Sequence, residues 1–276
     1  MNIGIVGLGL IGGSLAKAIK KYSENKVFGY DLSSQVLQKA QEEGSVDIEL
    51  SPENIGKCHL ILLAIYPQAT VKYVKDNKNH FSPNTIIIDC CGVKKYICDE
   101  IQPIAAKNNF NFIGGHPMAG LEVAGYENSC AELYNNASMI LTPKKDEKEE
   151  IIKTAAEFFL SLGFNHIEIT TPENHDKNIA YTSQLAHVVS NAYIKSPGSA
   201  VHQGFSAGSY KDLTRVAKLE ENMWTELFME NRDNLLNEIN LLTKHLKEYA
   251  TALENQDEKY LKELLKTGRK LKEEVD

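Results

Sequence analysis

The chain has few of the features that mark exported or membrane-bound proteins. It lacks any run of about 18 apolar residues, the length that a membrane-spanning helix needs. The apolar start at 1–11 has neither a basic leader nor a cleavage site, and glycines interrupt it. This start predicts a strand and a turn and not a signal peptide. We therefore expect a cytoplasmic protein with no membrane segment.

Cysteine is scarce and positive charge is not in excess. The five cysteines include the adjacent pair Cys90 and Cys91, and none has the CxxC spacing of a zinc site. In a chain without an export signal they are expected to be reduced thiols. The formal net charge of -7 argues against a broad nucleic-acid-binding surface, which requires clustered Lys and Arg. The composition therefore favours a small-molecule partner, with neither metal nor nucleic acid bound.

The first part of the chain alternates short apolar runs with amphipathic stretches. The apolar runs are rich in β-branched or aromatic residues and are bounded by turn residues, as is typical of buried strands. They lie at 2–6, 26–30, 60–65, 85–89, 111–113, 138–142 and 166–170. Helical candidates between them lie at 14–21, 34–43, 68–75 and 147–162. This alternation predicts an α/β fold with a Rossmann-type, doubly wound parallel sheet.

After residue 170 the strand-like runs stop and long helical periods replace them. Pro172 suits the start of a helix. Apolar residues then repeat at helical spacing, with Asn231 as a polar exception. The expected helices lie at 174–194, 220–249 and 256–272. The sequence thus predicts two domains, an NAD-binding Rossmann-type domain at 1–170 and an all-α substrate and dimerisation domain at 171–276.

A glycine-rich turn follows the first predicted strand. Gly7 permits the tight turn, Gly9 lets the backbone approach a pyrophosphate, and Gly12 allows the next helix to pack closely. The second strand ends in Asp31, whose carboxylate can accept a hydrogen bond from a ribose hydroxyl and would repel a 2′-phosphate. The pattern predicts NAD as the cofactor, although the same fold also binds S-adenosylmethionine or FAD. The expected cofactor-binding residues are Gly7, Leu8, Gly9, Leu10, Ile11, Gly12 and Asp31.

A histidine follows a later predicted strand, in the segment Gly-Gly-His-Pro-Met-Ala-Gly at 114–120. An open α/β sheet binds its ligands at this edge. An imidazole held between glycine and proline in a loop is suited to proton transfer, because its pKa lies near the working pH. A loop histidine on its own is more often structural, so the interpretation of His116 depends on the motifs around it.

Four motifs resemble those of the prephenate and arogenate dehydrogenase family, in the family's order and over nearly the whole chain. They are GLGLIGGS at 7–14, HPMAG at 116–120, SQLAH at 183–187, and DLTRVA at 212–217 with a Trp further on. The resemblance implies oxidative decarboxylation of prephenate to 4-hydroxyphenylpyruvate in tyrosine biosynthesis. A hydride leaves ring carbon C4 for NAD, the C1 carboxylate departs as CO₂, and the ring becomes aromatic. Arogenate, which has an amino group in place of the side-chain keto group, remains an alternative substrate.

The resemblance also implies roles for individual residues. His116 resembles the residue that takes the proton of the C4 hydroxyl, and Arg215 resembles the one that binds a substrate carboxylate. The other positions expected at the substrate are His187, Gly92, Lys94, Asp212, Glu122 and Trp224. The two acidic residues resemble positions that gate the site. For His187 and Trp224, simple packing in the core is an open alternative.

One position departs from the family's pattern. Many relatives have a Ser in a DxGSxK segment, where this chain has Gly92. The family's Ser supports the catalytic His and touches the substrate hydroxyl, which a glycine cannot do through a side chain. A water, a backbone amide or the neighbouring Cys91 could substitute. Lys94 is retained, and we expect it to help hold the substrate or the cofactor.

Two other functions fit parts of the pattern. A dehydrogenase of the same architecture that acts on a β-hydroxy acid or an imine would use a lysine of the helical domain, where Lys177 and Lys195 are available. A non-catalytic NAD sensor would need neither His116 nor Arg215. The resemblance further implies a homodimer formed through the helical domain. Any inhibition by tyrosine is expected to be competitive, because too few residues follow the long helix for a regulatory domain.

Overall fold

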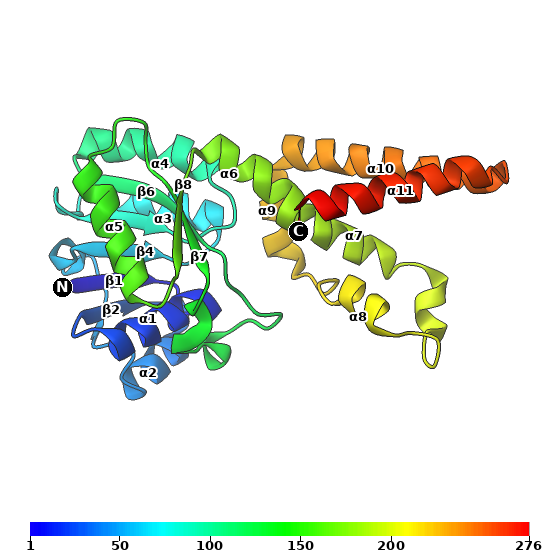
Figure 1. Ribbon diagram of the computed structural model, residues 1–276. Coiled ribbons are helices and arrows are strands. Elements are labelled where there is room, and N and C mark those ends of the chain that lie inside the picture. The colour runs from blue at the N-terminus through cyan, green and yellow to red at the C-terminus, as the bar shows by residue number, and fades with distance from the viewer. Residues whose placement is uncertain (276) are drawn as a thin grey trace.

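The computed structural model describes residues 1–275, and it has an α/β part from which an arm of helices extends (Figure 1). The strands are β1 (Asn2–Val6), β2 (Lys26–Tyr30), β3 (Ile48–Glu49), β4 (Leu60–Leu63), β5 (Ile86–Asp89), β6 (Asn111–Pro117), β7 (Ser138–Thr142) and β8 (His166–Ile169). They form one sheet in the order β3-β2-β1-β4-β5-β6-β7-β8. Each neighbouring pair is parallel except β6 and β7, which are antiparallel. The predicted fold class is confirmed. The antiparallel pair β6 and β7 was not predicted.

Helices cover both faces of this sheet. They are α1 (Leu10–Tyr22), α2 (Ser34–Glu42), α3 (Pro67–Asn77), α4 (Lys95–Asn108) and α5 (Glu149–Ser161). Successive residues of β4 enter different cores: Leu60 and Leu62 belong to the cluster on one face, and Ile61 and Leu63 to the cluster on the other. Such strands are buried on both sides, as in doubly wound folds. The strand order reverses beside β1, and ligands of such sheets bind at the carboxyl edge of that point.

The remaining helices form the arm. They are α6 (Pro172–Ile179), a π-helical turn (Ala180–Gln184), α7 (Leu185–Tyr193), α8 (Gly208–Thr214), α9 (Glu221–Glu230), α10 (Arg232–Glu254) and α11 (Glu258–Val275). Short 3-10 turns occur at Ile55–Lys57, Tyr126–Asn128, Ala131–Tyr134 and Pro197–Val201. In Figure 1, α10 and α11 lie side by side and point away from the sheet. Within residues 1–275, every helix is too short or too polar to cross a membrane.

The helix predicted at 220–249 is two helices in the structure. The chain leaves helical geometry at Asn231, which has φ −117° and ψ 27° and separates α9 from α10. The side-chain amide of this buried residue donates to the carbonyl of Asp176 at 2.8 Å and to Oε1 of Gln184 at 2.8 Å. The polar exception in the apolar repeat is therefore a hydrogen-bonded joint between helices, and the prediction of one helix was wrong there.

Candidate active site

The glycine turn after β1 has the close contacts and the open space that a nucleotide site needs. Gly7 has φ +86°, and a side-chain carbon on it would lie 2.5 Å from the carbonyl oxygen of Ala64. A carbon on Gly12 would lie 1.8 Å from the carbonyl oxygen of Gly7, whereas no atom lies within 4 Å of one on Gly9. The first amides of α1 have no side-chain cap. This space at a helix N-terminus fits a pyrophosphate.

Asp31 lies beside the same turn. Its carboxylate accepts hydrogen bonds from the amide of Leu8 at 2.7 Å and from the amide of Ser33 at 2.9 Å. Leu8 is buried in the core and offers the site only its backbone, while Leu10 and Ile11 are half-buried. An acidic group here suits a ribose with free hydroxyls better than one with a 2′-phosphate. The residues therefore fit an adenine dinucleotide such as NAD.

His116 lies within β6 and not in a loop after it, which corrects the expectation from the sequence. β6 pairs with β5 only as far as Ile113, but the antiparallel β7 extends it, so that His116 pairs with Ile140. The preceding Gly115 packs closely, because a side-chain carbon there would lie 2.5 Å from the carbonyl oxygen of Asp89. The sheet register thus fixes the backbone of His116.

His116 contacts His175, which in turn contacts Asp176, and neither residue was predicted from the sequence. Nδ1 of His116 lies 2.9 Å from Nε2 of His175, and Nδ1 of His175 lies 2.7 Å from Oδ1 of Asp176. The same carboxylate accepts the amides of Lys94 at 2.8 Å and Lys95 at 2.9 Å. His175 and Asp176 are both buried, on α6. The available sequence signal was a His-Asp pair in the first turns of the first helix after the sheet.

The surroundings keep both imidazoles neutral. Burial lowers the pKa of His116 well below its usual value, and the charges of His175 and Lys94 act in the same direction. Burial also lowers the pKa of His175, although the hydrogen bond to Asp176 opposes it. A neutral imidazole can accept a proton at its free nitrogen. His116, which stays partly exposed, is therefore able to act as a base.

Lys94 supports the site from inside the protein. Its ammonium group forms an ion pair with Asp89 and donates to the carbonyl of Gly115 at 2.5 Å, and neither charged side chain is exposed. Burial lowers the pKa of this lysine, but the Asp89 carboxylate together with Cys91 and Cys98 raises it overall. Two of its three donors are used between β5 and β6, and its expected contact with substrate or cofactor stays a prediction. Lys94 fixes the strand end that carries His116.

Gly92 lies beside the other nitrogen of His116. A side-chain carbon on Gly92 would lie 3.9 Å from Nε2 of His116 and 3.5 Å from Cδ2 of Leu227, in α9. Cys91 does not take the place of the missing hydroxyl, because its thiol donates to the carbonyl of Ile65 at 3.2 Å. The Nε2 atom therefore lies on the side of the ring toward Gly92 and α9.

The rings of His187, on α7, and Trp224, on α9, face each other. Their ring centroids are 4.1 Å apart, at an interplanar angle of 32°. Nδ1 of His187 donates to the carbonyl of Ser183, in the π-helical turn, at 2.9 Å. Both rings are only half-buried, and Trp224 precedes Leu227 by three residues on α9. The two rings are therefore partly open to solvent and are not packed in a closed core.

Arg215 is held by the segment that follows His116. Its Nη1 donates to Oε1 of Glu122 at 2.9 Å, and the two side chains are 65% and 51% exposed. Glu122 is six residues beyond His116, so this ion pair links the end of α8 to the strand that carries the histidine. Asp212, on α8, is exposed and stands outside the pair. A guanidinium that already binds one carboxylate can exchange it for a carboxylate of a ligand.

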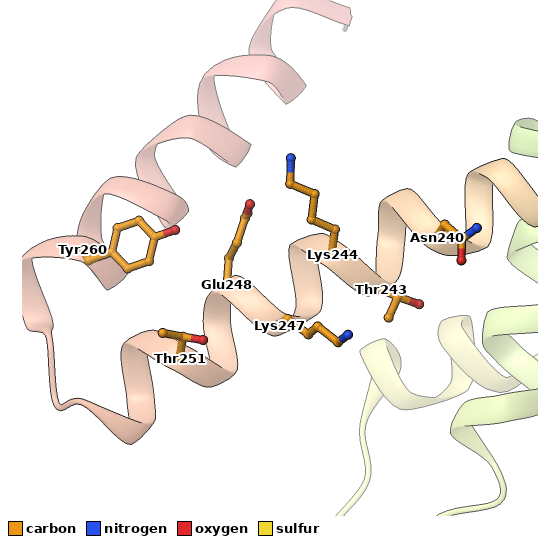
Figure 2. Close-up of a pocket in the computed structure, with 7 residues that line it drawn as sticks. All are labelled: Asn240, Thr243, Lys244, Lys247, Glu248, Thr251 and Tyr260. Atoms are coloured by element: carbon orange, nitrogen blue, oxygen red, sulfur yellow. The ribbon is translucent and has the colours of Figure 1, made fainter.

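Two hollows lie away from these residues. A groove of about 440 Å³ separates α10 from α11 (Figure 2). Its lining is polar: Asn240, Thr243, Lys244, Lys247, Glu248, Thr251 and Tyr260. A second hollow of about 470 Å³ lies between the segment after β6 and the turn around Leu133. Neither is lined by a predicted site residue. Within residues 1–275, His, Cys, Asp and Glu side chains form no group of three that could hold a metal ion.

Comparison with known proteins identifies the family. The nucleotide-binding domain of prephenate dehydrogenase matches residues 15–168, and its dimerization domain matches residues 171–267. The cyclohexadienyl dehydrogenase of Zymomonas mobilis is 30% identical, over 98% of this chain and 94% of that protein.

Solved structures agree in sequence and in fold. The prephenate dehydrogenase of A. aeolicus, in complex with hydroxyphenyl propionate and NAD+, is 28% identical with a TM-score of 0.88, over 100% of this chain and 98% of that one. The Synechocystis arogenate dehydrogenase is 27% identical with a TM-score of 0.82, over the whole of both chains. The chain therefore belongs to the prephenate dehydrogenase family, dehydrogenases of aromatic amino acid biosynthesis that bind NAD(H).

Proposed function

We propose that this protein catalyses the NAD-dependent oxidative decarboxylation of prephenate to 4-hydroxyphenylpyruvate. The observation that carries the proposal is the geometry of His116, whose Nδ1 is engaged by His175 while Nε2 lies on the side of Gly92. The A. aeolicus relative binds NAD+ together with hydroxyphenyl propionate, which supports a ring substrate of this kind. A lysine acid–base group finds no comparable support, since Lys177 and Lys195 are both exposed on the arm.

The protein's own part in the reaction is to orient the ring and to move one proton. NAD, when bound, supplies the acceptor for the hydride that leaves C4. His116 accepts a hydrogen bond from the C4 hydroxyl through Nε2 and takes its proton as the hydride leaves. Loss of the C1 carboxylate as CO₂ then makes the ring aromatic, which drives the reaction.

Arg215 is proposed to bind a carboxylate of the substrate. In the structure its guanidinium is paired with Glu122, so binding exchanges one carboxylate partner for another. Hydrogen bonds to charged groups contribute about 1.5–3 kcal/mol, which corresponds to about ten- to a hundredfold in affinity. We expect Arg215→Ala to raise the KM for prephenate by this factor with a smaller effect on kcat.

NAD is proposed as the preferred cofactor. The amides of the glycine turn and the N-terminus of α1 would hold the pyrophosphate, and Asp31 would accept from the adenosine ribose. The carboxylate would repel the 2′-phosphate of NADP. Replacing Asp31 with Ser should reduce the preference for NAD over NADP, measured as the ratio of the kcat/KM values for the two cofactors.

The deciding experiment is a steady-state assay with prephenate and arogenate, each with NAD and with NADP. His116→Gln should lower kcat by about 10²–10⁴-fold and leave the Kd for NAD unchanged. Turnover of arogenate without turnover of prephenate would favour the second candidate, an arogenate dehydrogenase like the Synechocystis relative. NAD binding with turnover of neither substrate would favour a sensor.

We also propose a two-domain, homodimeric organisation in the cytoplasm, with the boundary near residue 170. The sheet ends at Ile169 and the arm begins at Pro172. Residues 171–267 match the family's dimerization domain. Tyrosine shares a hydroxyphenyl ring with the proposed product and would compete with prephenate for the active site. Inhibition by tyrosine that excess prephenate does not relieve would contradict this.

A further inference from the structure

The carboxylate of Asp176 is held as an acceptor on both oxygens. Oδ1 accepts the amide of Lys94 and Oδ2 accepts the amide of Lys95, at 2.8 and 2.9 Å. Backbone amides can only donate, so neither oxygen needs to carry a proton. These amides begin α4, a helix of 14 residues, and helix N-termini favour negative charge. Asp176 is therefore a fixed, ionised acceptor inside the protein.

This acceptor determines where the protons of two imidazoles lie. Because Asp176 can only accept, the hydrogen between it and His175 belongs to Nδ1 of His175. Nε2 of a neutral His175 is then bare and accepts from Nδ1 of His116. A neutral His116 with its hydrogen on Nδ1 has a bare Nε2.

We propose that His175 and Asp176 are positioning residues that set the tautomer of His116, so that its Nε2, beside Gly92, is the proton acceptor. The use of that nitrogen in chemistry rests on the proposed function, but the tautomer itself does not. An unconstrained neutral imidazole can carry its hydrogen on either nitrogen, and only one of the two forms can take a proton from a substrate at Nε2.

This chain depends on the His175 contact because nothing else orients the ring. Within the described residues 1–275, His175 is the only hydrogen-bond partner of the His116 side chain. Gly92 offers no hydroxyl to Nε2, and the thiol of Cys91 is directed to Ile65. The other charged groups near the ring are Lys94 and Asp89, which pair with each other.

His175 and Asp176 belong to the helical arm, and hydrogen bonds fix their position. Asn231, at the joint between α9 and α10, donates to the backbone carbonyl of Asp176 at 2.8 Å. The carboxylate of Asp176 in turn caps α4 of the α/β part. The tautomer of the base is thus coupled to the correct docking of the arm on the sheet.

Nitrogen-15 NMR of histidine-labelled protein tests the tautomer directly, because protonated and bare ring nitrogens resonate far apart. His116→Gln identifies the signals of that ring. We expect wild-type protein above pH 7 to show a protonated Nδ1 and a bare Nε2. In Asp176→Ala, His175 loses the acceptor that fixes its hydrogen on Nδ1, so the hydrogen of His116 should be distributed over both ring nitrogens. A wild-type ring protonated at Nε2, or a single tautomer unchanged in Asp176→Ala, would overturn the proposal.

Kinetic measurements provide a second, independent test. His175→Gln places an amide oxygen near the position of Nε2 and can still accept from His116, so kcat should stay within about tenfold of wild type. His175→Leu has similar size without an acceptor, and kcat should fall further than in His175→Gln but less than in His116→Gln, which removes the base itself. The acid limb of the kcat/KM pH profile should move in His175→Leu and not in His175→Gln. Equal losses and equal profiles in the two variants would contradict the proposal.

The tautomer proposal and the proposed function can fail independently of each other. The Kd for NAD reports whether each variant is folded, and if His175→Leu does not fold, the comparison of His175→Gln with Asp176→Ala replaces it. A protein that turned over neither prephenate nor arogenate would sink the proposed function, while the NMR result would still decide the tautomer.

Discussion

A side-chain carbon on Gly92 would lie 3.9 Å from Nε2 of His116, with Leu227 at 3.5 Å as its nearest neighbour. These are ordinary van der Waals distances, and the backbone of Gly92 is not in the left-handed region that favours glycine. The position can therefore take a small side chain. A hydroxyl there would be within reach of the nitrogen that the proposed reaction uses.

Gly92→Ser is therefore expected to increase activity. One hydrogen bond contributes about 0.5–1.5 kcal/mol, so we expect kcat with prephenate to rise by about two- to tenfold. Gly92→Ala is the matched control, because it fills the same space without a hydroxyl and should not exceed wild type. Steady-state kinetics gives kcat for both variants. Equal kcat values for Gly92→Ser and Gly92→Ala would show that the hydroxyl has no role.

Lys94→Met is expected to destabilise the fold strongly. The substitution leaves the fully buried carboxylate of Asp89 without its ion-pair partner, and breaking a buried pair in this way costs about 3–5 kcal/mol. Lys95→Met is the control, since the adjacent side chain is 52% exposed and its pair with Asp99 is worth at most about 1 kcal/mol. Urea denaturation gives both free energies of unfolding. Similar losses in the two variants would refute the structural role given to Lys94.

The Rossmann-type part could be predicted because its signals are local. The β-branched runs gave β1, β2 and β7 with their observed bounds, and the two-residue β3 is too short for such a run. The spacing from the glycine turn to Asp31 placed one carboxylate at the cofactor site, where it bonds to Leu8. These features depend on residues close in sequence, or on the order of strands in a known type of sheet.

The catalytic neighbourhood could be predicted only in part, because its contacts join distant segments. His175 lies 59 residues from His116, and no periodicity or spacing indicates that the two rings meet. Lys94 matched a motif, but a lysine is expected on the surface, and only the structure shows that Asp89 allows it to be buried. Asn231 interrupted a helical repeat for the same reason: its partners come from another helix.

Stability is expected to fall as the solution becomes mildly acidic. Burial first of all lowers the pKa of both His116 and His175 in the folded protein. Unfolded histidines bind protons below about pH 6.5, where the folded ones stay neutral, so stability present above that pH is lost as the pH falls toward the folded pKa values.

The slope of this loss can be measured. Each histidine that is protonated only when unfolded contributes up to about 1.4 kcal/mol per pH unit. Urea denaturation between pH 8 and pH 5 should therefore show a shallower slope for His116→Gln than for wild type. His166→Gln, at an exposed position of β8, is the control. A slope that is the same in all three proteins would mean that His116 takes up its proton as readily in the folded as in the unfolded protein.

The proposed dimer makes a prediction about one face of α10. Leu235, Leu246 and Leu253 lie on the same side of this helix, because they are separated by 11 and 7 residues. The first is 5% exposed, against the folded chain, but the other two are 59% and 63% exposed, where the helix extends away from the sheet (Figure 1). An apolar face that is covered at one end and open at the other indicates that a second copy covers the rest.

Leu246→Glu should therefore weaken the dimer. A carboxylate buried in an apolar interface loses its hydration without gaining a partner, so the dimer should dissociate at protein concentrations where wild type remains paired. Leu160→Glu is the matched control, because Leu160 is also exposed, at 46%, but lies on α5 of the α/β part. Light scattering should give twice the 30.8 kDa of one chain for wild type and for Leu160→Glu, and a lower mass for Leu246→Glu. A wild-type protein with the mass of a single chain would contradict the dimer, and a fully dimeric Leu246→Glu would move the interface away from this face of α10.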